Sequence, residues 1–363
     1  MRVLLAGGGT GGHLMPALAI AAALRQLRPE VEPVLVGAER GVEARILPER
    51  DFRYHLLPFE PIYRRTWWRN ARWLGLLPRL LRAGARVLDA ESPAVAVGTG
   101  GYASGPILLQ ASRRGIPVVL QEQNAWPGVT TRWLAGRARH IYLGFPEARG
   151  RLRAGKSSRI FDFGNPIAPP PAVRTVRAEA RARFGLPAER PVVLVMGGSQ
   201  GARAVNRTVA AALDGGLLAG VALLWSVGQG QWEQYRQYDD HPGCVVRPFL
   251  DPIAHAYEAV DLAVARAGAM STAELCAWGI PSVLVPLPTA AGGHQAVNAE
   301  AMARDGAAVC LPEAELDPGR LAREVRAIAG DPVRLAEMGR AALSRGHPNA
   351  AQNIAREILG LVG

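Results

Sequence analysis

The chain has 363 residues, of which 49% are apolar and 20% are charged, and its formal net charge is +11. This length exceeds what one hydrophobic core usually supports, so about two domains are expected, and the composition excludes a disordered protein. No signal-peptide pattern and no long uncharged apolar stretch occurs, which predicts neither export nor a membrane span. The three cysteines, Cys244, Cys276 and Cys310, are scattered along the chain, which indicates reduced core residues. We therefore expect a cytoplasmic setting.

The positive charge is confined to the first part of the chain. Residues 1–165 contain 24 Lys and Arg against 12 Asp and Glu, whereas residues 166–363 contain 18 against 19. Such an imbalance favours a polyanionic partner: nucleic acid, an anionic membrane surface or a pyrophosphate. No recognisable nucleic-acid fold accompanies the charge, so we expect no nucleic-acid partner.

Short apolar runs, rich in β-branched residues and bounded by Gly or Pro, alternate with helical stretches and predict buried parallel strands. The prolines of residues 164–175 exclude helix and central strand there, so the pattern divides into two halves. Two amphipathic helices, about 331–343 and 349–361, follow the last strand. We therefore predict an α/β chain with two Rossmann-like, doubly wound parallel-sheet domains facing a cleft. The expected strands are 3–6, 33–36, 94–97, 117–120 and 140–143, then 192–196, 221–227, 245–248, 262–265, 282–285 and 308–311.

Each half opens with a strand, a glycine-rich turn and a helix. The first turn spans residues 7–12 and the second spans residues 197–201. Such turns expose backbone N–H groups at a helix N-terminus, where the helix dipole favours phosphate. One such turn can merely reflect tight packing, but two of them are better explained by two phosphate-bearing substrates.

Several motifs occur in the order seen in one family of transferases, and they cover nearly the whole chain. The motifs are Gly8–His13, Gly100–Pro106, Glu122–Asn124, Gly164–Pro166, Gly197–Ala202, Arg266–Glu274 and His294–Ala299. In these motifs the chain resembles the MurG family of glycosyltransferases. The resemblance implies a GT-B fold with an acceptor-binding, membrane-associating domain (1–163), a UDP-sugar-binding domain (164–345) and a final helix (346–363) that returns to the first domain.

The activity implied by this resemblance is an inverting transfer of N-acetylglucosamine from UDP-N-acetylglucosamine (UDP-GlcNAc). The implied acceptor is the 4-hydroxyl of N-acetylmuramic acid in lipid I, the undecaprenyl-pyrophosphoryl-linked muramoyl pentapeptide, and the product is lipid II of peptidoglycan biosynthesis. The implied location is the cytoplasmic face of the plasma membrane, as a peripheral protein.

No Asp-x-Asp metal motif lies at a plausible strand end, and the adjacent acids Asp239 and Asp240 fit a surface helix. We therefore expect no cofactor and no protein-bound metal, with the donor pyrophosphate stabilised by helix N-termini and hydroxyls. The resemblance assigns Ser199 to a phosphate, Glu274 to the ribose and Gln295 to the sugar. The alternative for Ser199 is that it only caps a helix. The alternative for Glu274 is that the helix dipole alone favours a carboxylate there. The full expected donor set is Thr10, Gly11, Gly12, Asn124, Ser199, Leu250, Ala269, Met270, Ser271, Thr272, Glu274, Gln295 and Asn298.

His13 is the expected acid–base residue, because an imidazole has an unperturbed pKa of about 6.5 and suits proton transfer near neutrality. The alternatives are that His13 binds the acceptor pyrophosphate as a cation, or that it is structural. The acceptor is expected to contact Gly9, Thr10, His13, Tyr102 and Ser104.

A stretch from residue 67 to residue 82 contains three tryptophans, several leucines and four arginines. This composition is typical of a segment at a membrane interface, although a partly buried helix is the alternative. Pro78 is expected to divide the segment into two pieces. The expected membrane residues are Trp67, Trp68, Arg69, Arg72, Trp73, Leu76 and Leu77.

The chain departs from the family pattern at the position of a nucleotide-contacting arginine, where Ala168 stands. Arg203 and Arg266 are the candidate substitutes. Three alternative functions remain: a GT-B transferase with another sugar or lipid acceptor, a dinucleotide oxidoreductase using Glu39, and a non-catalytic UDP-GlcNAc sensor.

Overall fold

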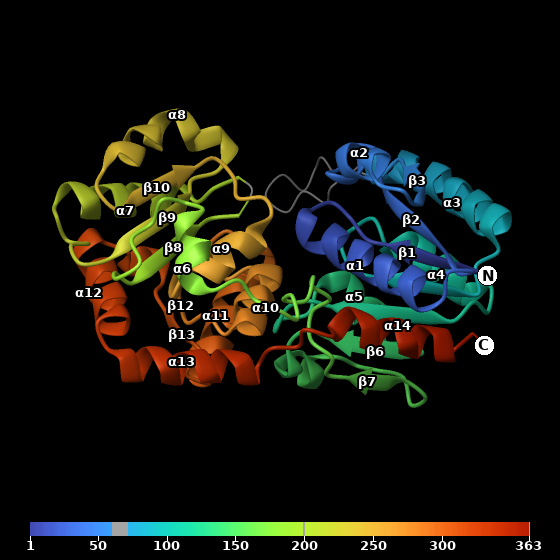
Figure 1. The fold of residues 1–363 in the computed structure, drawn as a ribbon. Coiled ribbons are helices and arrows are strands. Elements are labelled where there is room, and N and C mark those ends of the chain that lie inside the picture. Colours follow the sequence, from blue (N-terminus) through green and yellow to red (C-terminus); the bar gives the residue numbers. More distant parts are fainter. Residues whose placement is uncertain (60–71, 199, 363) are drawn as a thin grey trace. The chain divides into compact units, whose positions relative to one another are not determined.

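The computed structural model describes residues 1–59, 72–198 and 200–362 of the chain, without the side chains of residues 72–75. It divides into two compact units, one made of residues 1–168 and 348–363 and the other of residues 169–347. Each unit contains one parallel β-sheet with helices on its faces (Figure 1).

The first unit is built on a seven-stranded sheet in the order β3-β2-β1-β4-β5-β6-β7. All neighbouring strands are parallel, which requires a crossover after each strand. The strands are β1 (Arg2–Ala6), β2 (Glu32–Ala38), β3 (Arg53–Leu57), β4 (Val95–Gly98), β5 (Val118–Glu122), β6 (His140–Leu143) and β7 (Arg159–Phe161).

Helices cover both faces of this sheet. The central strand β1 is therefore buried on both sides, which explains its continuously apolar sequence. Val3 and Leu5 pack against α1 (Gly11–Leu27) and α14 (Ala350–Gly360), whereas Leu4 packs on the opposite face. Side chains of a strand alternate between faces, so a strand buried on both faces must be continuously apolar. The last helix, α14, lies along α1, so the end of the chain belongs to the first unit (Figure 1). The remaining helices are α2 (Glu43–Ile46), α3 (Arg72–Glu91), α4 (Gly105–Arg113) and α5 (Val129–Leu134), with 3₁₀ turns at Leu47–Glu49, Ala135–Arg137 and Pro146–Arg151.

The second unit has a six-stranded parallel sheet in the order β10-β9-β8-β11-β12-β13. Its first strand, β8, lies in the middle of the sheet, as β1 does in the first unit, so both glycine-rich turns leave a central strand. The strands are β8 (Val192–Met196), β9 (Ala222–Ser226), β10 (Cys244–Arg247), β11 (Leu262–Ala265), β12 (Ser282–Leu284) and β13 (Ala308–Cys310).

In the core of this unit, Nε1 of the buried Trp225 donates a hydrogen bond to Oδ1 of Asn206 at 2.9 Å. Helices cover the faces of the sheet (Figure 1). They are α6 (Arg177–Ala182), α7 (Arg203–Asp214), α8 (Trp232–Tyr235), α9 (Ile253–Ala259), α10 (Ala269–Trp278), α11 (His294–Arg304), α12 (Pro318–Ala329) and α13 (Pro332–Ser344), with 3₁₀ turns at Gln229–Gln231, Arg236–Asp240, Ala291–Gly293 and Glu313–Glu315.

The expected break at Pro78 is wrong. A single helix, α3, runs from Arg72 to Glu91 with Pro78 inside it. Pro78 is exposed and stands in the second turn of α3, where one missing N–H removes a single bond of the helical ladder. The part of the predicted membrane segment before residue 72 lies outside the described residues.

Candidate functional site

The first glycine-rich turn connects β1 to α1 at the carboxyl edge of the sheet, the edge at which open α/β sheets bind ligands. Gly9 has φ +93°, and a Cβ at this position would meet the ring of Tyr102. Gly100, also with φ +93°, packs so closely on the His13 ring that a Cβ would lie 2.8 Å from Nδ1. The loops after β1 and β4 therefore interlock, and only glycine permits both the backbone conformation and the approach.

A buried carboxylate supports this turn from below. Glu43, the first residue of α2, is completely buried, and its Oε1 accepts a hydrogen bond from the N–H of Gly9. Its Oε2 is buried without a hydrogen-bond partner among the described residues. Burial raises the pKa of Glu43, which backbone hydrogen bonds, that of Gly9 among them, partly oppose. The sequence alone gives no reason to single out Glu43, because a lone glutamate in a short polar stretch is typical of a solvated helix face.

Because Glu43 occupies the N–H of Gly9, a phosphate at this turn must use other donors. The N–H groups of Gly11 and Gly12 begin α1 and have no hydrogen-bond acceptor within the described residues, whereas that of His13 bonds the carbonyl oxygen of Thr10 at 3.1 Å. Thr10 is exposed and is the N-cap residue, without a side-chain capping bond. Anion-binding capacity at this turn therefore centres on Gly11 and Gly12.

The hydrogen bonds of His13 determine which ring nitrogen carries the proton. Its Nδ1 lies 3.0 Å from the carbonyl oxygen of Thr99 and 3.1 Å from Oε1 of Gln123. Gln123 presents that oxygen because its Nε2 donates to the carbonyl oxygen of Thr99 at 2.8 Å. Both neighbours of Nδ1 are acceptors, so Nδ1 carries the hydrogen and the neutral ring presents Nε2 as a proton acceptor.

The loop after β4 brings Tyr102 and Ser104 to the same edge of the sheet. Tyr102 is partly exposed and lies beside Gly9, with Phe59 packed edge-on at 6.5 Å between ring centres. Ser104 is completely buried, and its hydroxyl donates to the carbonyl oxygen of Gly101 at 3.1 Å. The Ser104 side chain thus stabilises the loop, whereas Tyr102 offers a partly accessible phenol.

Asn124, after β5, is held by a buried acid. Glu122 accepts hydrogen bonds from the backbone N–H of Asn124 and from the N–H of Gly128, both at 3.0 Å. This carboxylate closes the loop that carries Asn124 and leads to the start of α5.

In the second unit, a cavity of about 610 Å³ opens at the carboxyl edge of the sheet. Its walls come from the second glycine-rich turn, the start of α7, the first turn of α10 and the loop after β12. The polar side chains that line it include Arg203, Arg266, Ser271, Gln295 and Glu313. A cavity of this size and polarity matches a nucleotide-sized ligand.

The first turn of α10 carries four of the expected donor residues, and their side chains differ in availability. Ser271 lines the cavity. Thr272 is buried, and its hydroxyl donates to the carbonyl oxygens of Gly268 and Ala269 at 3.0 Å each. Met270 is partly exposed, so backbone groups and Ser271 are the accessible features at this helix start.

Glu274 stands one turn further along α10, three residues after Ser271, and so lies on the same side of the helix. Its side chain is partly exposed, and its Oε2 accepts a hydrogen bond from the hydroxyl of Tyr257 at 2.7 Å. Burial raises the pKa of Glu274, and the hydrogen bond from Tyr257 opposes this shift.

Gln295 and Asn298 lie on the same side of α11, but Gln295 faces the cavity and Asn298 is buried. Gln295 lines the cavity, and its Oε1 accepts from the N–H of Leu287 at 2.9 Å, which turns its amide NH₂ outward. Asn298 is completely buried and donates to the carbonyl oxygen of Ala267 at 3.1 Å, so it holds the loop before α10. Leu250 is buried, while its neighbour Phe249 is 47% exposed.

The two arginines of the cavity are not equivalent. Arg266 forms an ion pair with Glu313 (Nη2 to Oε2, 2.6 Å) and also donates to the carbonyl oxygen of Val285. Arg203 is exposed at the start of α7, and no carboxylate pairs with it in the described part of the unit. Arg203 therefore has the guanidinium available for an anionic ligand.

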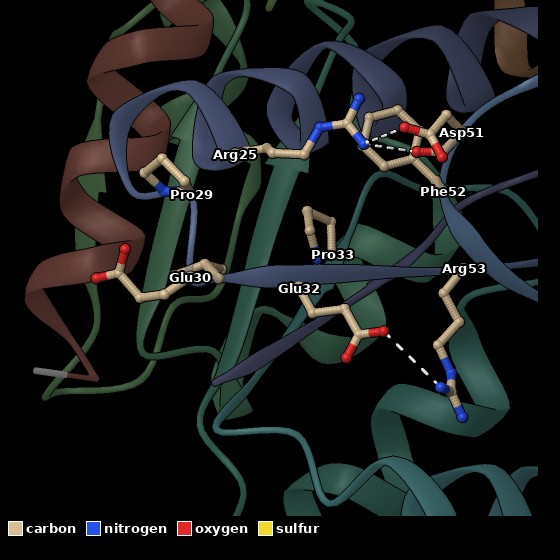
Figure 2. A pocket seen from close by; sticks show the side chains of 9 residues that line it. Arg25, Pro29, Glu30, Glu32, Pro33, Asp51, Phe52 and Arg53 are labelled. Carbon is tan, nitrogen blue, oxygen red and sulfur yellow. Dashed lines mark hydrogen bonds and ion pairs between the residues drawn. The ribbon is translucent and has the colours of Figure 1, made fainter.

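Two further hollows lie in the first unit, near the amino ends of strands. One, of about 270 Å³, is shown in Figure 2. Its charges pair with one another: Arg25 donates to Oδ2 of Asp51 at 3.0 Å, and Arg53 faces Glu32 at 3.8 Å. The other, of about 490 Å³, lies between the start of β6 and the end of α14. Both are on the edge opposite the glycine-rich turn, where ligands of such sheets are not bound.

Among the residues that the structure describes, no helix is long and apolar enough to span a bilayer, and no group of three His, Cys, Asp or Glu side chains is arranged to hold a metal ion. Asp239, one of the adjacent acids, is bound by the N–H of Val246 and by Arg247.

Comparison with known proteins places the chain in a family. The model of the glycosyltransferase family 28 N-terminal domain matches residues 3–143, and that of the C-terminal domain matches residues 192–354. A Salinibacter ruber protein is 41% identical over 99% of this chain and 96% of its own length. A Moorella thermoacetica protein is 40% identical over 100% of this chain and 99% of its own length. Both are named UDP-N-acetylglucosamine--N-acetylmuramyl-(pentapeptide) pyrophosphoryl-undecaprenol N-acetylglucosamine transferase.

The chain belongs to the MurG family of glycosyltransferases. The crystal structure of Acinetobacter baumannii MurG agrees, with a TM-score of 0.79, 27% identity and 99% coverage of both chains. The expected GT-B fold, with two parallel α/β sheets, is thereby confirmed.

Within this MurG-family chain, several expected site residues cannot be placed. Ser199 and the segment containing Trp67, Trp68 and Arg69 lie outside the described residues, as do the side chains of Arg72 and Trp73. Their roles stay predictions. The buried Glu43 and Tyr257, in contrast, are recognised only from the contacts that the structure shows.

Proposed function

We propose that this chain transfers N-acetylglucosamine from UDP-GlcNAc to the 4-hydroxyl of N-acetylmuramic acid in lipid I, giving lipid II. The observation that carries the proposal is 41% identity, over nearly the full length of both chains, to a transferase whose name states this reaction. The cavity at the second glycine-rich turn and the tautomer of His13 supply a donor pocket and a base that such a reaction needs.

The second unit is the proposed donor-binding unit. The nucleotide occupies the cavity, with its pyrophosphate at the starts of α7 and α10 and near Arg203. The ribose binds Glu274, and the sugar binds the outward amide of Gln295. Ser271 contributes a hydroxyl, while Thr272 and Asn298 act by holding the backbone. Arg203 supplies the positive charge that Ala168 cannot.

The first unit is the proposed acceptor-binding unit, with His13 as general base. The acceptor oxygen attacks C1 of the sugar, the C1–O bond to UDP breaks with inversion, and the hydroxyl proton passes to Nε2 of His13. The released UDP carries the electron pair of the broken bond. In this proposal the N–H groups of Gly11 and Gly12, which the motifs assign to the donor, bind the acceptor pyrophosphate instead, with Tyr102 beside the turn.

A peripheral contact of the first unit with an anionic membrane surface completes the proposal. In α3, Leu77 is 43% exposed and is followed by the exposed Arg79 and Arg82. In α5, Val129 is 56% and Trp133 is 50% exposed. Exposed apolar side chains near arginines suit the boundary between headgroups and acyl chains.

A panel of nucleotide sugars tests the donor assignment. With a short-chain lipid I analogue as acceptor, UDP release is expected from UDP-GlcNAc and at least about tenfold more slowly from UDP-glucose, which lacks the acetamido group. A faster rate with another sugar, or with a diacylglycerol acceptor, would replace the proposal by a different GT-B transferase activity.

A further inference from the structure

Tyr257 is the residue that determines how the carboxylate of Glu274 is presented. It is carried by α9, the short helix before β11, whereas Glu274 belongs to α10, which follows that strand. The hydroxyl of Tyr257 donates to Oε2 of Glu274 at 2.7 Å, the length of a strong hydrogen bond to a charged acceptor. The contact joins two helices within the second unit.

The direction of this hydroxyl is fixed by packing. Tyr257 is only 4% exposed, and its ring lies against Trp278, with 5.7 Å between ring centres and 48° between planes. Trp278 is one turn after Glu274 on α10 and is covered on its outer side by the guanidinium of Arg174, 5.0 Å from its ring centre. A tyrosine held in this way has little freedom to aim its hydroxyl elsewhere.

The hydrogen bond leaves most of the acceptor capacity of Glu274 unused. An ionised carboxylate has about four acceptor positions on two oxygens, and Tyr257 uses one of them. No hydrogen bond to Oε1 is found within the described residues, and the side chain is partly exposed, one turn of α10 away from Ser271, which lines the cavity. The carboxylate is thus anchored on its inner side and open on its outer side.

A carboxylate anchored at one oxygen is suited to recognise two adjacent hydroxyls, because its orientation is set before the ligand arrives. Sites built to bond a hydroxyl reject the analogue that lacks it far more strongly than apolar sites discriminate by size. Without the anchor the carboxylate can rotate. Its hydrogen bonds to the ligand must then offset the conformational entropy that the side chain loses on binding.

We propose that Tyr257 is a positioning residue that holds Glu274 for the ribose 2′- and 3′-hydroxyls, so that the enzyme selects ribonucleotide over 2′-deoxyribonucleotide donors. This inference rests on the proposed function, in which Glu274 binds the ribose. Tyr257 itself does not touch the ligand, and it acts through the orientation of the carboxylate.

The test compares Tyr257→Phe with wild type, using UDP-GlcNAc and 2′-deoxy-UDP-GlcNAc as donors. Loss of one hydrogen bond is expected to raise KM for UDP-GlcNAc about five- to twentyfold, with kcat within about twofold. The KM ratio between the deoxy donor and UDP-GlcNAc is expected to fall towards one. Tyr238→Phe is the matched control, because Tyr238 also donates to a carboxylate of this unit, Asp214, at 3.0 Å and away from the cavity.

Two further measurements separate the possible failures. Glu274→Gln, assayed in parallel, must itself lose the preference for the ribo donor; if it does not, the ribose role of Glu274 is wrong and the inference falls with it. If Glu274→Gln loses the preference while Tyr257→Phe keeps it, the positioning role alone is overturned. A thermal unfolding curve for Tyr257→Phe shows that the enzyme is folded, so a raised KM with an unchanged ratio would indicate a merely structural residue and also contradict the proposal.

Discussion

The backbone N–H of Gly9 donates a hydrogen bond to the buried carboxylate of Glu43, 34 residues further along the chain. An acidic side chain thus lies under a turn that we expected to bind a negative ligand. The turn binds an anion at its other N–H groups, and Glu43 determines which ones are available. Glu43 is therefore a supporting residue of the acceptor side that substitution can test.

Replacement of Glu43 by glutamine is expected to have a small effect and replacement by alanine a large one. Glutamine retains an oxygen that can accept from Gly9, so kcat is expected to stay within about threefold of wild type. Alanine removes that acceptor and opens a buried space, so stability is expected to fall by about 2–4 kcal/mol and kcat by at least tenfold. Denaturant titration and steady-state kinetics measure both effects.

The pH dependence of stability in wild type and in Glu43→Gln gives a second check of the role of Glu43. Because burial raises the pKa of Glu43, the folded protein binds its proton more tightly than the unfolded chain does. Wild-type stability is therefore expected to fall as pH rises above the unfolded value of about 4.3, towards the folded pKa, and Glu43→Gln is expected to reduce this fall. A glutamine variant as unstable as the alanine variant at neutral pH would contradict the assignment.

The buried Glu91 is expected to show the opposite pH dependence. Burial raises its pKa, but hydrogen bonds from His55 (2.6 Å) and Arg53 (2.9 Å) outweigh burial and leave the pKa lowered. Glu91→Gln is expected to cost about 1–3 kcal/mol above pH 5, and this cost should shrink as pH falls below about 4.

Glu32 provides the control for Glu91, because it also pairs with Arg2 and Arg53 but is 44% exposed (Figure 2). Glu32→Gln is expected to cost less than about 1 kcal/mol. Equal costs for the two variants at neutral pH, measured by chemical denaturation, would show that burial of Glu91 does not strengthen its interactions.

Kinetics distinguish a general base from a pyrophosphate ligand at His13. A base is required only in the transition state, so His13→Ala is expected to lower kcat by about 10²–10⁴-fold while KM for lipid I analogue changes little. Gln123→Leu, which leaves the ring but removes one acceptor from Nδ1, is expected to lower kcat about three- to tenfold. A raised acceptor KM with kcat nearly intact in His13→Ala would instead identify a pyrophosphate ligand.

Arg203 and Arg207 lie one turn apart on α7, and only Arg203 lines the cavity. Arg203→Ala is expected to raise KM for UDP-GlcNAc about five- to thirtyfold, because a charge-assisted hydrogen bond to phosphate is lost. Arg207→Ala should leave KM unchanged. The same increase in both variants would indicate a general effect of charge on α7 rather than a phosphate contact.

Periodicity and glycine signals predict the central strands well, because those strands are apolar on both faces. The edge strands of the first sheet, β3 and β7, were not predicted. Three of the five residues of β3 are Arg53, Tyr54 and His55, and β7 has three residues beginning with Arg159. An edge strand is half solvated and needs no continuous apolar run, so its sequence resembles a loop.

The site residues divide in a similar way, because some follow from local sequence motifs and others only from tertiary contacts. The motifs single out His13, Ser271 and Gln295, and the structure places them at the glycine turn or along the cavity, since their positions follow from the strand–turn–helix order. The partners Glu43 and Tyr257 come from other elements, and only tertiary packing shows that they meet Gly9 and Glu274. No local pattern encodes such contacts.

The most direct test of the central claim is the formation of lipid II from radiolabelled UDP-GlcNAc and a short-chain lipid I analogue. We predict robust transfer by wild type, loss of turnover in His13→Ala and a raised donor KM in Glu274→Ala. Absence of transfer by a wild-type protein that still binds UDP-GlcNAc would contradict the account and indicate another acceptor or a binding protein without catalysis.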